Sequence, residues 1–245
     1  MSDSNADKPL FKRIVVKLSG EALMGSDAFG LNGETMTRIA LDLKAAADLG
    51  AQVAVVVGGG NFFRGIRGAD KGIERARADS IGMLATVMNA LAMEGALEEI
   101  GQPARVLSAV PMPSQCQPYS RQAALAHLAK RRVILLAGGT GNPFFTTDTG
   151  AALRAAELSC DAVMKATNVD GIYTADPKRD PNAKRFERLT HDDAITMNLQ
   201  VMDTAAFALA RENRIPIVVF SVHEAGAIAQ ALLGRGRATY VMPTA

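Results

Sequence analysis

Six short apolar runs, each separated from the next by a longer stretch, constrain the fold of this chain most strongly. Each run is apolar nearly throughout and rich in Val, Ile or Leu, which is typical of parallel strands covered on both faces. The runs are Ile14–Leu18, Val53–Val57, Arg105–Leu107, Val133–Ala137, Ala162–Met164 and Ile217–Phe220. We therefore expect a parallel sheet at the centre of the fold.

The stretches between these runs predict helices. Met36, Ile39, Leu43 and Ala47 recur at helical spacing, and Gly50 supplies a C-terminal stop. Further helices are expected at Ala76–Ile100, Arg121–Lys130, Thr149–Ser159, Asp203–Asn213 and Glu224–Leu233. The repeated alternation predicts an α/β protein with a doubly wound, mainly parallel sheet and helices on both faces.

Length and composition suit one domain. The 245 residues are 48% hydrophobic, enough for a sizeable core. We expect a polar N-terminal tail over residues 1–11 and a single domain over residues 12–245. The charged segment Asp176–Arg188, which contains Pro177 and Pro181, is expected to be an exposed loop or hairpin at the seam between two lobes.

Charge and cysteine usage favour a cytoplasmic protein. The net charge of +2 gives no reason to expect a nucleic-acid or membrane partner. The polar N-terminus lacks the apolar stretch of a signal peptide, and no segment approaches 18 uninterrupted apolar residues. Cys116 and Cys160 have neither metal-ligand nor CxxC spacing, so reduced thiols are expected.

Three of the predicted strands run directly into glycine, at Ser19-Gly20, at Gly58-Gly59-Gly60 and at Gly138-Gly139-Thr140-Gly141. Ligands of open parallel sheets bind beyond the carboxyl ends of the strands, and glycine lets backbone N–H groups converge on an anion. The three loops therefore predict a polyphosphate site. The chain has no GxxxxGK followed by Ser or Thr, no GxGxxG after a strand, and no protein-kinase motif set.

Charged residues beside these loops suit phosphoryl transfer. Lys17 and Lys165 interrupt or follow apolar strands, where burial without an anionic partner is costly, although both could instead extend to solvent. Together with Arg64 they could stabilise the charge on a transferred phosphoryl group. Asp148 and Asp203 each precede or begin a helix, and they are expected to cap it or to orient Mg²⁺ or the lysines.

Longer motifs at these positions resemble the bacterial UMP kinases, which have the amino-acid kinase fold. The motifs are Lys17-Leu18-Ser19-Gly20-Glu21-Ala22-Leu23, Gly58-Gly59-Gly60-Asn61 through Arg64-Gly65, Thr140-Gly141-Asn142-Pro143-Phe144-Phe145-Thr146-Thr147-Asp148, Lys165-Ala166-Thr167, Val169-Asp170-Gly171 and Thr174-Ala175-Asp176-Pro177. The resemblance covers the chain from about Lys12 to a last strand near Val241. The strand-end lysine and the triple glycine are shared across the fold, whereas the stretch from Thr140 to Asp148 is specific.

The resemblance implies ATP and UMP as substrates, with transfer of the γ-phosphoryl group to give UDP and ADP in pyrimidine nucleotide synthesis. It implies an N-terminal acceptor-binding lobe and a C-terminal ATP-binding lobe, with Lys17, Arg64, Asp148 and Lys165 in catalysis. The ATP residues that it implies are Lys17, Leu18, Ser19, Gly20, Gly60, Arg64, Thr167, Asn168, Tyr173 and Asp176. The UMP residues that it implies are Gly59, Asp79, Thr140, Gly141, Asn142, Pro143, Phe144, Phe145, Thr146 and Thr147.

The resemblance also implies Mg²⁺, a homohexamer, activation by GTP and inhibition by UTP. The GTP-responsive loop would be Gly25-Ser26-Asp27-Ala28-Phe29-Gly30, and Asp148 and Asp203 would be candidate metal ligands. Two alternatives stay open at this point. One is a kinase of the same fold that acts on a carboxylate or carbamate, and the other is a nucleotide-binding storage or regulatory protein.

Overall fold

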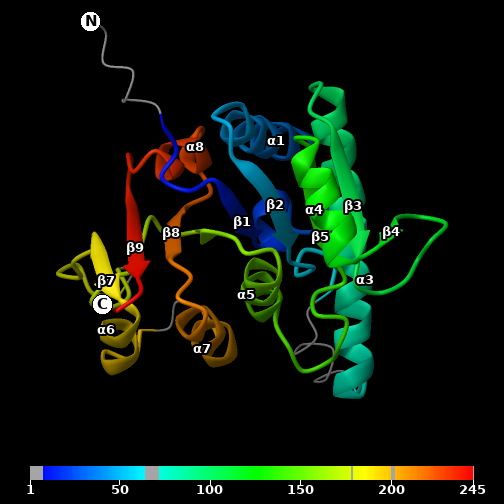
Figure 1. Ribbon diagram of the computed structural model, residues 1–245. Coiled ribbons are helices and arrows are strands. Elements are labelled where there is room, and N and C mark those ends of the chain that lie inside the picture. The colour runs from blue at the N-terminus through cyan, green and yellow to red at the C-terminus, as the bar shows by residue number, and fades with distance from the viewer. Residues whose placement is uncertain (1–7, 64–71, 178, 200–201, 245) are drawn as a thin grey trace, which may run out of the picture.

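The computed structural model describes residues 8–63, 72–177, 179–199 and 202–244. Within these residues the chain forms a nine-stranded sheet of order β4-β3-β5-β2-β1-β6-β8-β9-β7 (Figure 1). The strands are β1 (Arg13–Leu18), β2 (Gln52–Val57), β3 (Ala104–Ser108), β4 (Gln117–Pro118), β5 (Val133–Ala137), β6 (Ala162–Thr167), β7 (Arg188–Thr190), β8 (Ile217–Ser221) and β9 (Ala238–Met242). Neighbouring strands pair in parallel except β8 and β9, which pair antiparallel.

Helices cover both faces of this sheet. They are the 3₁₀ helix η1 (Gly20–Leu23), α1 (Gly33–Asp48), α3 (Arg75–Glu99), α4 (Arg121–Ala129), α5 (Thr147–Glu157), α6 (His191–Thr196), α7 (Thr204–Glu212) and α8 (Ala227–Leu232). The helix α1 begins where the side chain of Asn32 accepts a hydrogen bond from the backbone N–H of Thr35, and it is followed by Gly50 at φ +94°.

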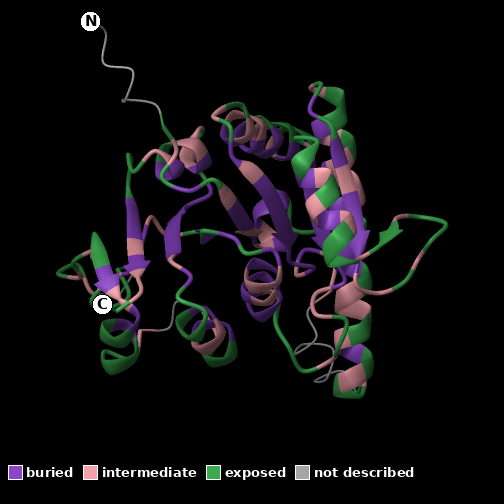
Figure 2. Cartoon of the chain, viewed as in Figure 1, coloured by how far each residue is buried: buried purple, intermediate pink, exposed green. Residues whose placement is uncertain are grey.

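Alternate residues of each central strand belong to two separate cores. Ile14, Val16 and Leu18 of β1 pack with α1, α3 and α8, whereas Val15 packs with α4, α5 and α7 on the opposite face. Figure 2 shows the central strands buried and the outward sides of the helices exposed. This two-sided burial explains why the strands are apolar along their whole length.

All six predicted strands and all six predicted helices are present, with their ends displaced by a few residues. The segment Asp176–Arg188 is largely exposed in its described part, and Tyr173 bridges Arg185 in antiparallel fashion at its base. The prediction of an exposed loop or hairpin is therefore confirmed for the described part, whereas its place at a seam between two lobes stays a prediction. The short elements β4, β7 and α6 were not predicted, because each has too few residues to show a period.

Candidate functional site

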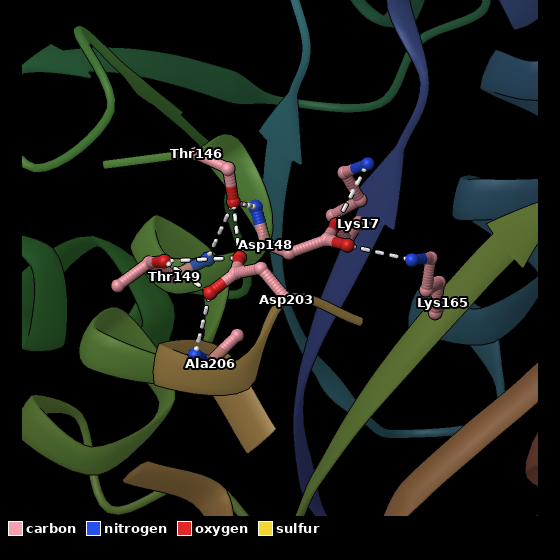
Figure 3. A network of polar contacts seen from close by, with 7 residues as sticks. All are labelled: Lys17, Thr146, Asp148, Thr149, Lys165, Asp203 and Ala206. Carbon is pink, nitrogen blue, oxygen red and sulfur yellow. Dashed lines mark hydrogen bonds and ion pairs between the residues drawn. The ribbon is translucent and has the colours of Figure 1, made fainter. Parts of the chain in front are cut away.

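Two lysines from neighbouring strands lie side by side at the carboxyl edge of the sheet. Lys17 on β1 and Lys165 on β6 are direct register partners, so their side chains leave the same face. Asp148 lies between them, with Oδ1 2.8 Å from Nζ of Lys17 and Oδ2 2.6 Å from Nζ of Lys165 (Figure 3). The structure thus brings three of the predicted catalytic residues together.

These three side chains are only 12% to 15% exposed, so little solvent screens their charges. Burial by itself raises the pKa of Asp148, but the ammonium groups of Lys17 and Lys165 outweigh it and hold that pKa below its ordinary value. Burial lowers the pKa of Lys165, and Asp148 partly offsets this effect. With all three groups ionised the cluster carries a net positive charge, which suits a polyphosphate.

The start of α5 fixes the position of Asp148. The N-cap of α5 is Thr146, whose hydroxyl accepts from the backbone N–H groups of Asp148 at 3.1 Å and Thr149 at 3.2 Å. The expectation that Asp148 caps this helix is therefore wrong. Thr146, Thr147 and Asp148 can all act as caps, and the cap at Thr146 leaves the Asp148 carboxylate free to point at the lysines.

Asp203 does cap a helix, as expected. Its Oδ1 accepts from the backbone N–H of Ala206 at the start of α7 at 2.9 Å. The same carboxylate accepts hydrogen bonds from the hydroxyls of Thr146 and of Thr149, the latter at 3.0 Å (Figure 3). Asp203 therefore ties the start of α5 to α7.

The glycine loops after β1 and β2 are in close contact. A Cβ on Gly20 would lie 2.6 Å from the carbonyl oxygen of Gly58 and 2.8 Å from the backbone nitrogen of Gly60, so only glycine fits. Leu18 is fully buried at the end of β1, and Ser19 follows it. Arg64, a predicted catalytic and ATP-binding residue, lies outside the described residues.

The helix α3 contacts the glycine loops after β2 and β5, through two residues that the sequence analysis missed. The hydroxyl of Thr86 accepts from the backbone N–H of Gly138 at 2.8 Å. The side-chain amide of Asn89 donates to the carbonyl of Gly58 at 2.6 Å and to Oδ1 of Asn61 at 2.7 Å. Two buried polar residues spaced three apart on a largely apolar helix are the signal that could have identified them.

A cavity of about 600 Å³ opens beside Lys165, large enough for a nucleotide base and ribose. Thr167, Tyr173 and Asp176, three residues predicted to bind ATP, line it. The side chain of Asn168, a fourth, instead has its Oδ1 3.1 Å from Nε2 of His223, where the amide oxygen accepts a hydrogen bond from the protonated imidazole nitrogen. None of the remaining lining residues was predicted to bind ATP, although some belong to the motifs that carry the resemblance: Val169, Gly171, Ile172, Thr174, Ala175, Pro177, Met197, Asn198, Leu199 and Val219.

Seven of the ten residues predicted to bind the acceptor line a second, smaller cavity of about 120 Å³, and Gly141, Pro143 and Phe144 do not. Its lining includes Gly59, Asp79, Thr140, Asn142, Phe145, Thr146 and Thr147 from that prediction, together with Phe63, Gly82, Met83, Thr86 and Gly139. Asp79 accepts from the backbone N–H of Phe144 at 2.8 Å and pairs with Arg75 at 2.9 Å. Phe144, at φ +72°, is 66% exposed beside this cavity.

The loop Gly25–Gly30 touches the loop after β2. The backbone N–H of Gly30 donates to the carbonyl of Asn61 at 3.3 Å, and the rings of Phe29 and Phe62 meet edge to face at 5.4 Å. Phe29 is 67% exposed. A perturbation of this loop therefore has a short contact path to the glycines at Gly58–Gly60.

The described residues contain no group of three His, Cys, Asp or Glu side chains that could hold a metal ion. Oδ1 of Asp148 is buried, and within the described part of the chain its polar contact is the ammonium group of Lys17 at 2.8 Å. Mg²⁺ keeps several waters and takes one or two carboxylates plus substrate phosphates. The site therefore fits Mg²⁺ as a companion of bound phosphates, whereas the oxygens of Asp203 are already used in capping and hydrogen bonds.

Comparison with known proteins agrees with this geometry. The chain matches the amino acid kinase family over residues 12–221. The uridylate kinase of Azorhizobium caulinodans is 64% identical over 233 residues, which are 95% of this chain and 98% of that protein. The uridylate kinase of Nitrobacter winogradskyi is 57% identical, over 96% of this chain and 99% of that protein. The crystal structure of UMP kinase from Bacillus anthracis superposes with a TM-score of 0.92 at 37% identity, over 96% of this chain and 97% of that one.

The chain therefore belongs to the amino acid kinase family. Within that family it is a member of the uridylate kinases, also called UMP kinases, which it matches over nearly its whole length.

Proposed function

We propose that this enzyme transfers the γ-phosphoryl group of ATP to UMP, giving UDP and ADP. The observation that carries the proposal is the pair of register-matched lysines bridged by Asp148. Lys165 lines the larger cavity, and Thr147, the neighbour of Asp148 in the chain, lines the smaller one. The cationic cluster therefore lies where a phosphoryl group would pass from a donor in the first cavity to an acceptor in the second.

In this mechanism the protein positions the reactants and stabilises charge. Phosphoryl transfer spreads negative charge over the oxygens of the moving group, and fixed cations placed there lower the barrier. Lys17 and Lys165 supply those cations, and Asp148 keeps both ammonium groups in place before the substrates bind. The backbone N–H groups of Gly20 and Gly60 would supply further donors to the donor phosphates, whereas that of Gly58 already donates to the carbonyl of Leu18.

ATP implies a divalent metal, and we assign Mg²⁺. It would be held by the phosphates and water, with Asp148 as the candidate protein ligand, and it would neutralise phosphate charge. Asp203 acts in our proposal through Thr146 and Thr149 rather than as a ligand, because its oxygens already accept hydrogen bonds from those hydroxyls and from α7.

We place the adenosine part of ATP in the larger cavity, against Tyr173, with Thr167 and Asp176 beside it. UMP would extend from the smaller cavity across the exposed Phe144 and Phe145, because 120 Å³ is too small for a whole nucleotide. Asp79 would accept from the ribose hydroxyls while it holds the backbone of Phe144.

We also propose a cytoplasmic homohexamer that GTP activates and UTP inhibits. The apolar outer stripe of α3 supports subunit contact, since Leu84 and Met88 are 44% and 50% exposed while Met93 and Leu97 are buried against the sheet. By length and composition α3 could cross a membrane, but 39% of its most apolar window is buried in the fold. GTP is assigned to Gly25–Gly30.

An ADP-release assay with five acceptors tests the proposed activity. UMP, CMP, dUMP, acetylglutamate and carbamate are each offered with MgATP. We expect UMP to be preferred by the ratio of kcat/KM, and a preference for acetylglutamate or carbamate would establish the alternative kinase. Nucleotide binding without turnover of any acceptor would instead indicate a storage or regulatory protein.

A further inference from the structure

One face of α3 contacts the loops after β2 and β5, through a backbone carbonyl and two polar side chains. Gly82, Thr86 and Asn89 follow one another at intervals of four and three residues, so they share a face of the helix. Farther along the same face Met93 and Leu97 are fully buried in the apolar core. The polar groups of this face thus lie near the middle of α3, beside the glycine loops.

Each of Gly82, Thr86 and Asn89 contacts a different part of the site. A Cβ on Gly59 would lie 2.7 Å from the carbonyl oxygen of Gly82, so the loop after β2 rests directly on α3. Thr86 accepts from the backbone N–H of Gly138 in the loop after β5. Its hydroxyl donates to the carbonyl of Met83 at 2.7 Å, which leaves a lone pair aimed at Gly138.

Asn89 holds the loop after β2 through a reciprocal amide pair with Asn61. Asn61 and Asn89 are 2% and 0% exposed, and each donates to the side-chain oxygen of the other, at 2.9 and 2.7 Å. The remaining amide hydrogens go to the carbonyls of Gly58 and Gly30. All four amide hydrogens therefore have an acceptor, and such a satisfied buried network fixes its members in one arrangement.

We propose that Thr86 and Asn89 are positioning residues that set the distance between the donor phosphates and the acceptor. The inference rests on the proposed function, in which Gly60, in the loop after β2, serves the donor phosphates and the loop at Gly138–Gly141 serves UMP. Because one rigid helix holds both loops, its two polar contacts fix their separation. Thr86 also lines the smaller cavity, whereas Asn89 lines neither of the two cavities, so Asn89→Ala reports the positioning role by itself.

The variant Thr86→Val tests this role with little change of volume. It leaves the backbone N–H of Gly138 without its acceptor, while Thr86→Ser retains the hydroxyl. Asn89→Ala releases the loop after β2, and Ser80→Ala removes an exposed α3 hydroxyl that donates within the helix, to the carbonyl of Ala76. All four variants are assayed well below their own Tm, so that a smaller folded fraction does not lower the rate.

We expect Thr86→Val to lower kcat about 10- to 100-fold, the scale of a displacement near 1 Å, with smaller changes in KM for ATP and UMP. Thr86→Ser and Ser80→Ala should keep the parental kcat. A kcat within twofold of the parent in folded Thr86→Val and Asn89→Ala overturns the proposal, and so does an equal loss in Thr86→Ser.

Linked dinucleotides measure the separation itself. Adenosine and uridine joined through four, five or six phosphates are bound to the parent and to Thr86→Val by calorimetry. A fixed separation predicts that the parent favours one length and that the variant loses this preference. An unchanged order of affinities in a variant with low kcat overturns the distance argument. A parent that turns over none of the acceptors with ATP refutes the proposed function, independently of the variants.

Discussion

Replacing Asp148 with Asn removes the carboxylate that contacts both Lys17 and Lys165. The lost contacts are 2.8 and 2.6 Å long, and the side chains involved are at most 15% exposed. Removing one partner of a buried ion pair costs about 3–5 kcal/mol, because the remaining charge is uncompensated. We expect the lower end, about 3 kcal/mol, because the ammonium groups can turn toward solvent, and this corresponds to a fall in Tm of about 6–12 °C.

The pKa of Asp148 determines how this cost varies with pH. Its folded-state pKa lies below the ordinary value of 3.8, so ionised Asp148 stabilises the fold above pH 3.8. That contribution is lost as the pH falls through the folded-state pKa, because protonated Asp148 is neutral like Asn. The difference in free energy of unfolding between parent and variant should therefore be full at pH 7 and shrink below pH 3.8.

Urea unfolding followed by circular dichroism, over a pH series, measures this difference. ATP should raise the Tm of Asp148→Asn more than that of the parent, because its phosphates can replace the missing negative charge. Asp48→Asn, which breaks a solvent-exposed pair with Lys44, is the matched control and should change stability by less than about 1 kcal/mol. Equal stability of parent and Asp148→Asn at pH 7 would refute the reasoning.

Three further substitutions test the proposed site. Lys17→Met should lower kcat by roughly 10²-fold or more, about 3 kcal/mol, as measured by steady-state ADP release. The exposed control Lys12→Met should leave kcat unchanged. Near-normal turnover of Lys17→Met would remove Lys17 from the catalytic set. Asp79→Ala should weaken the preference for UMP over dUMP by about 1–3 kcal/mol in kcat/KM, and an unchanged ratio would show that Asp79 does not read the ribose. Replacing Ser26-Asp27-Ala28 with Gly-Ser-Gly should diminish the activation by GTP at sub-saturating UMP, which corresponds to a coupling free energy of about 1–3 kcal/mol. Full activation in a variant that light scattering shows to be an intact hexamer would contradict the loop assignment.

Much of the central fold could be predicted because its signals are local. The run Ile14–Leu18 is apolar apart from Lys17, and both faces of β1 are indeed covered. The pairing of Lys17 with Lys165 could not be read from either strand alone. It depends on β6 lying beside β1, which is decided by a long crossover connection and by packing across the whole sheet.

The finer features of the site depend on competition between similar groups. Thr146, Thr147 and Asp148 all have side chains that can cap a helix, and only the backbone geometry selects Thr146. Thr86 and Asn89 were overlooked because two polar residues three apart on an apolar helix are a weak signal until their burial is known. Their importance becomes visible only when the partners Gly138 and Gly58 are known.

The ladder between β1 and β6 has a mechanical consequence for the enzyme. These strands are aligned over five residue pairs, from Ile14 with Ala162 to Leu18 with Ala166. The backbones that carry the two lysines of the proposed site are therefore held at the fixed spacing of adjacent strands, about 4.8 Å. A hinge motion could move these two strands apart only by breaking hydrogen bonds in the middle of the sheet. Adaptation to a new acceptor would therefore occur in the loops at the sheet edge, which can change while the spacing of the two lysine backbones stays the same.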